Sequence, residues 1–133
     1  MELPKVVTCI LCEDVRIEEG HKLSLMGVFG YLPHAIIIVS NLNFVMKLSF
    51  VLMLEGGSGK AAIKFKVKEP NQKDFNPNIQ PQTQMEMTFE KGGRANLAWT
   101  IPNFVPRATG KYEVVVFAND QILYETDFEI SKL

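Results

Sequence analysis

The sequence lacks an excess of charge of either sign. Its 133 residues carry 14 lysine and arginine residues against 15 aspartate and glutamate residues, for a formal net charge of −1. Binding to nucleic acids depends on cationic side chains that neutralise phosphates, and binding to anionic lipid surfaces depends on basic segments. The composition therefore predicts neither a nucleic-acid partner nor a membrane partner.

Long hydrophobic runs are also missing. The longest apolar stretches lie near residues 35–39 and 44–54, which is too short for a bilayer span, and Lys47 interrupts the second. The apolar run at residues 6–12 stops at Glu13 without the small-residue cleavage site of a signal peptide. We expect a cytoplasmic protein, in which the two cysteines would be free thiols.

Residues that usually carry catalysis or bind metals are scarce. Cys9 and Cys12 form a Cys-x-x-Cys pair, but residues three apart on a strand point to opposite faces. Only His21 and His34 could complete a zinc site, and neither has a nearby carboxylate and nucleophile. The segment Gly56–Lys60 lacks the spacing and the hydroxyl of a phosphate-binding loop, and we interpret it as a hairpin turn. The sequence predicts no cofactor, no metal and no catalytic residue.

What the sequence does contain is alternation with a period of two. At residues 61–68, apolar positions such as Phe65 alternate with lysines, and Trp99 lies on the apolar side of a similar segment, so we expect both aromatic residues in the core. Such alternation is typical of strands with one buried side, and helical periodicity hardly appears. The expected strands lie at residues 6–12, 22–29, 35–39, 44–54, 61–68, 84–90, 96–101, 112–118 and 122–130. Short strands separated by turns predict a single domain over residues 1–133 with the architecture of a two-sheet β-sandwich.

The connecting segments carry turn residues. Asn119 and Asp120 predict a tight hairpin. The segment Glu69–Gln82 contains three prolines and no apolar periodicity, which predicts a long loop, either a crossover between the sheets or a functional flap. The lysines of residues 60–68 would face acidic residues of the strand at 84–90, which favours cross-strand charge pairs over a phosphate-binding stripe.

Two local patterns predict structural roles. Gly110 lies two residues before Tyr112 at the start of a strand, as in the tyrosine corner of immunoglobulin-like domains, where the phenol bonds to upstream backbone. This pattern favours an immunoglobulin-like, antiparallel sandwich. Asp14 and Arg16, at the end of the first strand, would clamp the following turn by pairing with each other or with backbone groups.

The N-terminal third contains the most distinctive string, Gly20-His21-Lys22-Leu23-Ser24-Leu25-Met26-Gly27-Val28-Phe29. This string resembles a family of uncharacterised small bacterial proteins that open with an Asp-x-x-Arg step and continue with a Gly-x-Lys-Leu-Ser-Leu-x-Gly-Val-Phe motif. The closing Gly-x-Tyr strand and hairpin of that family are similar to residues 106–128. The resemblance implies a compact β-sandwich and no established activity.

The strand expected at residues 44–54 is apolar on both faces, because Val45, Val51 and Met53 alternate with an already apolar set. Ile37 lies in another run of this kind. A sandwich covers only one face of a strand, so the second face needs another cover, and exposed apolar patches usually mark an interface. The cover could be a loop, another protein or a second copy of the chain. We expect an interface at these four residues, and we predict a non-catalytic protein-interaction module that binds a second copy as a homodimer or binds another protein.

Two other functions stay open. The first is a small-ligand binding module that uses the loop at residues 69–82 and the end loops as its mouth. The second is an enzyme with no recognisable motif. A deep pocket with converging polar groups would favour either of these over an interaction module.

Overall fold

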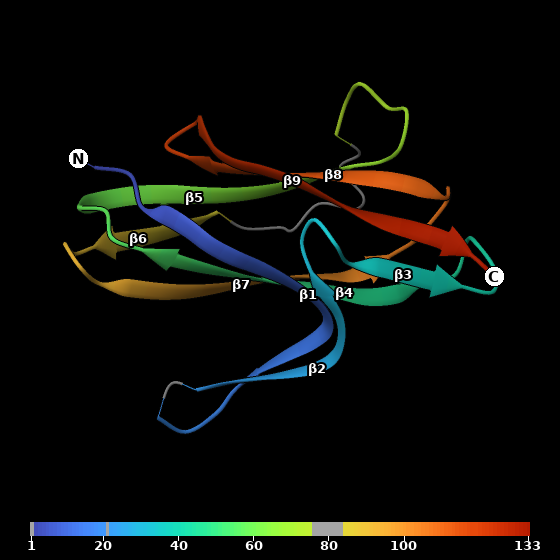
Figure 1. Cartoon of the computed structure of the whole chain (residues 1–133), viewed down its shortest axis with the longest axis horizontal. Helices are drawn as coiled ribbons and strands as arrows, with labels where there is room; N and C mark the ends of the chain where they lie inside the picture. The colour runs from blue at the N-terminus through green and yellow to red at the C-terminus, as the bar shows by residue number, and fades with distance from the viewer. Residues whose placement is uncertain (1, 21, 76–83) are drawn as a thin grey trace.

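A computed structural model describes residues 2–20, 22–75 and 84–133, and in it the chain forms two packed β-sheets (Figure 1). The strands are β1 (Lys5–Ile17), β2 (Leu23–Tyr31), β3 (Ile36–Val39), β4 (Met46–Glu55), β5 (Gly59–Lys68), β6 (Met85–Phe89), β7 (Arg94–Phe104), β8 (Gly110–Ala118) and β9 (Gln121–Lys132). One sheet has the order β2-β1-β4-β7, and the other has the order β3-β9-β8-β5-β6. The described ranges include no helix that could cross a membrane.

The core lies between the sheets, and the period-two pattern builds it. Along β5 the side chains of Ile63, Phe65 and Val67 are buried, while the lysines between them face outward. The Phe65 ring stacks on Trp99 of β7 at 5.3 Å between ring centroids, and it lies 4.5 Å from the ring of Phe50 on β4. Phe65 and Trp99 are thus core residues, as expected, and they join the two sheets.

The strand arrangement differs from the expected one in three respects, and the first two concern β3 and the turn after β4. β3 pairs with β9 in parallel, so the sandwich is not wholly antiparallel. The turn between β4 and β5 is not a hairpin, because these strands belong to different sheets. Gly57 allows this passage, since its backbone has φ +85° and a Cβ there would lie 2.9 Å from the nitrogen of Pro4.

The loop after β5 is also not a crossover between sheets. β5 and β6 are antiparallel neighbours in one sheet, with Ala61 opposite Met87, so the segment between them returns to the same sheet. Glu69 is buried, whereas residues 71–74 are exposed and lie in a loop that projects from the body (Figure 1). The rest of the expected flap, residues 76–82, lies outside the described residues.

Tyr112 pins the start of β8. Its hydroxyl donates a hydrogen bond to the carbonyl oxygen of Ala108 at 2.7 Å, and its buried ring stacks on Phe128 at 5.3 Å. Gly110 has φ +123°, and a Cβ there would lie 3.4 Å from the Pro70 ring. This contact brings the segment after β5 against the connection between β7 and β8.

The hairpin of β1 and β2 forms an arm. β1 pairs with β4 only as far as Cys12, opposite Ser49, while its pairing with β2 continues to Ile17, opposite Leu23. The register between β1 and β2 shifts between Leu11 and Cys12. The outer part of the hairpin therefore leaves the sheet, and Figure 1 shows it projecting below the body.

Candidate functional site

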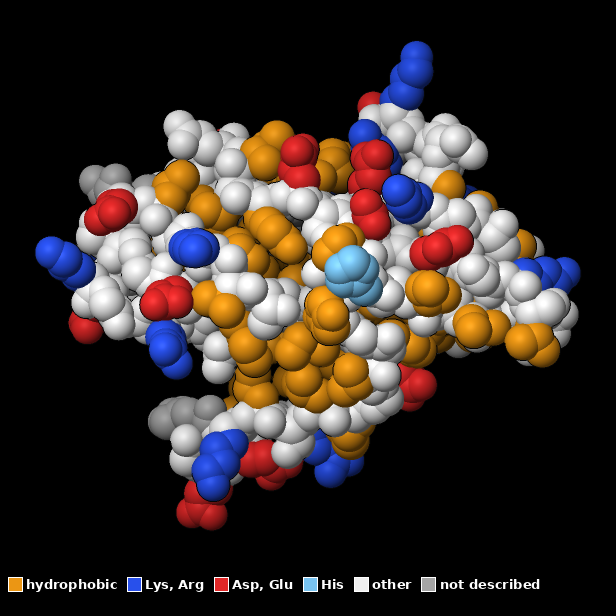
Figure 2. All heavy atoms as spheres, viewed as in Figure 1, with side chains coloured by type: hydrophobic (Ala, Val, Ile, Leu, Met, Phe, Trp, Pro, Cys, Tyr) orange, Lys and Arg blue, Asp and Glu red, His pale blue; other side chains and the backbone are white. Residues whose placement is uncertain are grey.

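The candidate site lies at the side of the sandwich where β2 and β3 are found. Each is the edge strand of its own sheet. Hydrophobic side chains gather in the middle of the face that Figure 2 presents, between the level of β9 and the arm formed by β1 and β2. Single exposed apolar residues are ordinary on a protein surface, but a gathering of them marks an interaction site.

The edge strand β3 has an outward apolar side as well as an inward one. Ile37 and Val39 are buried in the core, whereas Ile36 is 49% exposed and Ile38 is 64% exposed. Successive side chains of a strand point to opposite faces, so the two exposed isoleucines stand on the same face. After β3, the loop before β4 adds Val45, which is 63% exposed.

A groove with a volume of about 490 Å³ runs beside β3. Its apolar walls include Phe29 of β2, Ile38 of β3, Phe44 of the following loop and Met46 of β4. Polar groups line the remainder, namely Glu13, Ser40, Asn41 and Lys47. The groove therefore offers apolar side chains together with charged groups of both signs.

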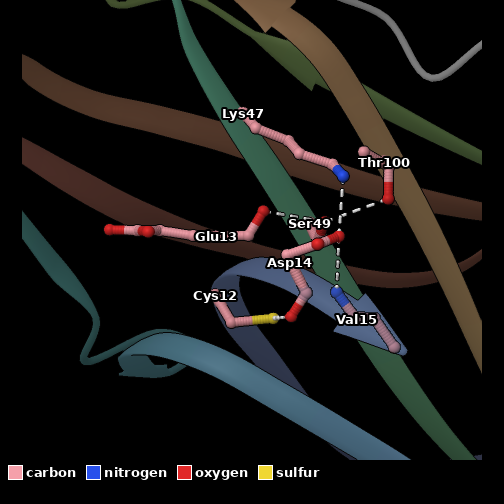
Figure 3. A network of polar contacts seen from close by, with 7 residues as sticks. All are labelled: Cys12, Glu13, Asp14, Val15, Lys47, Ser49 and Thr100. Carbon is pink, nitrogen blue, oxygen red and sulfur yellow. Dashed lines mark hydrogen bonds and ion pairs between the residues drawn. The ribbon is translucent and has the colours of Figure 1, made fainter. Parts of the chain in front are cut away.

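A polar network includes two of the residues that line the groove, Glu13 and Lys47 (Figure 3). The ammonium of Lys47 lies 2.7 Å from Oδ1 of Asp14, which also accepts a hydrogen bond from the backbone N–H of Val15 at 2.9 Å. The hydroxyl of Ser49 donates to the carbonyl oxygen of Glu13 at 3.2 Å and lies 2.9 Å from the hydroxyl of Thr100. The hydrogen bond from Lys47 holds the pKa of Asp14 below its usual value.

This network bears out one of the two expected forms of the clamp and changes the other. Asp14 accepts a backbone donor, the N–H of Val15, while its ion-pair partner is Lys47 on β4. Both residues of the expected clamp lie inside β1, which continues to Ile17, and not at its end. Asp14 therefore ties the arm to the sheet at the point where the two separate.

The carboxylate of Glu13 is directed differently. Figure 3 shows its side chain extending away from Asp14 and Lys47. The side chain passes over Gly27 of β2, where a Cβ would lie 2.6 Å from the carboxyl carbon of Glu13. Gly27 also has φ +63°, a conformation that glycine adopts without strain. This glycine thus leaves room for a carboxylate at the groove.

The four residues expected at an interface have different environments. Val45 is exposed, and Met53 is partly exposed. Val51 and Ile37 differ from the expectation, because they are 0% and 2% exposed within one chain and so neither offers a side chain at the surface of the monomer. Val51 does face away from the core, but it lies on a central strand between Ile10 and Ala98. Ile37 points into the core.

The remaining candidates are the two thiols and the two histidines. Cys9 and Cys12 are buried free thiols, and burial raises the pKa of Cys9 to about 12. His34 is exposed and packs edge-on against Tyr31, while His21 lies outside the described residues. Among the described residues, no group of three or more histidine, cysteine or acidic side chains could hold a metal ion.

The lysines of β5 pair with different partners than expected. Lys64 lies 3.0 Å from Asp120 in the turn after β8, and Lys68 lies 3.7 Å from Glu113 on β8. The acidic residues of β6 were the expected partners. β6 and β8 both flank β5, and the acidic residues that pair with these two lysines lie on β8 and in the turn after it.

The domain that holds this site corresponds to a known family. A model of a family of unknown function (DUF6941) matches residues 7–131. The chain belongs to the DUF6941 family. No curated protein matches the chain. The matched residues include β2 through β8 in full, so the groove and the exposed edge lie inside the DUF6941 domain.

In this DUF6941 protein, the exposure of Ile36 and Ile38 and the position of Glu13 beside Gly27 were not predicted from the sequence. The first two were hidden because the run Ile36–Val39 contains no polar residue that would show which side faces out. Knowing that residue 37 is buried would have assigned both neighbours to the outer face. Glu13 lies beside Gly27 only because β1 and β2 are paired, and no local motif records that contact.

Proposed function

We propose that this protein is a non-catalytic interaction module that self-associates as a homodimer through the edge strand β3 and the adjacent loop. The observation that supports the proposal is the exposed apolar side of β3, formed by Ile36 and Ile38 and accompanied by Val45. An edge strand presents unpaired backbone groups to which another chain can add. A twofold dimer needs only one self-complementary surface and is the commonest soluble assembly.

Each of the other sheet edges carries a charge, a proline or a register shift, whereas the short strand β3 carries none of these three. Natural proteins protect edge strands with charges, prolines and bulges. β7 carries the exposed Pro102, β6 carries the exposed Glu86, and β2 is paired to β1 through a shifted register. β3 consists of three isoleucines and a valine. This contrast supports β3 as the edge at which a second chain binds.

The strand order supports the immunoglobulin-like class for the fold. β1, β4 and β7 lie in the order of strands A, B and E, and β9, β8 and β5 lie in the order G, F and C. Tyr112 then stands at the start of strand F, the position of the tyrosine corner. On this assignment β2 and β3 are additions between strands A and B, and they are the strands that form the candidate site.

The same proposal includes a cytoplasmic location. It is supported by the free thiols Cys9 and Cys12, since a reducing compartment keeps cysteines unpaired.

Light scattering across a dilution series tests the self-association. Wild-type protein should pass from dimer to monomer on dilution, while Ile38→Lys and Val45→Lys should be monomeric at every concentration and keep the circular-dichroism signal of the sheets. Ile122→Lys is the matched control, because Ile122 is also an exposed apolar residue (57%) but lies outside the part of β9 that pairs with β3. Monomeric wild-type protein at high concentration would contradict the proposal.

A second candidate function is small-ligand binding, and the groove beside β3 is the observation that favours it. Lys47 is neutralised by Asp14, whereas no ion pair to Glu13 is found among the described side chains. The groove therefore suits a molecule with a hydrocarbon part and a cationic group.

A titration followed by NMR tests this second function. Hexylamine should shift the signals of groove residues and hexanoate should not, and Glu13→Gln should abolish the difference. Equal shifts with both molecules would exclude recognition by Glu13.

A further inference from the structure

The hydrogen bonds between β3 and β9 show which backbone groups of β3 are free. The carbonyl oxygens of Ala35 and Val39 accept from the N–H groups of Glu129 and Leu133, at 3.1 and 2.8 Å. In a parallel ladder, alternate residues of a strand direct both backbone groups to the same neighbour. Ala35, Ile37 and Val39 therefore bond toward β9, and Ile36 and Ile38 direct their N–H and C=O groups away from it.

A second β3 satisfies these groups in an antiparallel arrangement. In such a pair, two residues that face each other exchange both N–H···O bonds. If Ile36 lies opposite Ile38 of the second copy, the four outward residues make two such pairs, and the twofold axis passes beside Ile37. Registers displaced by two residues in either direction leave one of the two isoleucines outside the strand-to-strand contact.

The side chains match in the same register. Opposing residues of paired strands project to the same face, so the exposed Ile36 and Ile38 meet their counterparts on the outer face and the buried Ile37 meets its own on the inner face. On β9, Glu129 lies beside Ile36, and Ser131 lies beside Ile38. Glu129 of one copy is thus in line with Ser131 of the second copy, and no like charges face each other along this row.

We infer that two copies associate by antiparallel pairing of β3 with β3 of the second copy, with Ile36 opposite Ile38. The inference rests on the proposed self-association and specifies its geometry. It joins the five-stranded sheets of the two copies into one continuous sheet. The four isoleucines of the outer face then cover one another across the axis, which removes apolar surface from water.

Amide hydrogen exchange measured by NMR at high and low protein concentration tests this geometry. The N–H groups of Ile37 and Val39 bond to β9 and should be protected at both concentrations. The N–H groups of Ile36 and Ile38 should be protected only where light scattering records the dimer, and their protection should fall on dilution in step with the dimer fraction. Fast exchange of Ile36 and Ile38 in a protein that is dimeric would overturn the inference and leave the proposed self-association standing.

A pair of variants gives an independent test. Ile38→Pro removes an N–H group that the β9 ladder does not use, so the monomer should keep its fold, as edge strands tolerate proline. This variant should lose the dimer, and Ile38→Val, which keeps the N–H group, should retain it. A dimeric and folded Ile38→Pro protein would show that another surface mediates the association. A wild-type protein that is monomeric at all concentrations would instead remove the proposed function itself.

Discussion

The hydroxyl of Tyr112 is a single group whose loss can be measured. It donates to the carbonyl oxygen of Ala108 at 2.7 Å, and the ring is fully buried. Tyr112→Phe keeps the ring and leaves that carbonyl without this donor, which should lower the free energy of unfolding by about 1–3 kcal/mol. Urea denaturation of the two proteins measures the difference. Equal midpoints would show that water replaces the phenol at no cost.

Asp14 should make the stability of the fold fall as the pH is lowered. Its hydrogen bond with Lys47 lowers its pKa in the folded state. A carboxylate with a lowered folded pKa contributes stability above its unfolded pKa, and this contribution is lost as the pH falls through the folded pKa. The stability of the wild type should therefore fall more steeply on acidification than that of Asp14→Asn. Thermal melts between neutral and acidic pH compare the slopes, and parallel curves would contradict this role of Asp14.

Among the structural elements, the arm of β1 and β2 depends on a glycine in a left-handed conformation. Gly27 has φ +63°, and Glu13 occupies the space above it. Gly27→Ala should cost about 1–2 kcal/mol through backbone strain and should also displace the Glu13 side chain. Gly20→Ala is the control, because Gly20 has φ +79° with open space around it. If both variants have equal stability and leave the NMR signals of the groove unchanged, Gly27 has no role in placing Glu13.

The strands were predictable from the sequence, whereas their connections were not. Residues 61–68 alternate strictly, and the resulting strand β5 spans Gly59–Lys68 with the expected face buried. The turn residues at Gly56–Gly59 predict only that the chain changes direction. Glycines of this kind occur both in hairpins and in connections between two sheets, so they do not show which of the two forms. The parallel pairing of β3 with β9 depends on residues far apart in the sequence, which no local pattern contains.

The candidate site was predictable in its chemistry but only partly in its residues. Two-sided apolar strands correctly indicated that apolar side chains lie outside the core. The sequence does not show which strands and loops flank an outward residue, and these neighbours decide its exposure. Val51 is outward on the central strand β4 and is covered, while Ile38 is outward on the edge strand β3 and is open to solvent.

For the whole molecule, the aromatic contact between Phe65 and Trp99 joins one sheet to the other. Trp99→Ala or Phe65→Ala should lower the free energy of unfolding by about 3–5 kcal/mol, since each leaves a cavity in the core. The exposed Ile122→Ala should change it by less than about 0.5 kcal/mol. Chemical denaturation gives all three values, and a loss below about 1 kcal/mol at Trp99 would contradict its place in the core.

The parallel pairing of β3 with β9 also sets an order in time during synthesis. β3 emerges from the ribosome early, but its only partner among the described strands is the last one to be made. Until β9 is complete, the segment Ile36–Val39 has no place in the sheet, and such apolar segments favour aggregation of nascent chains. The edge that we propose for assembly is therefore also a segment that stays without its neighbour in the sheet until the last strand is made.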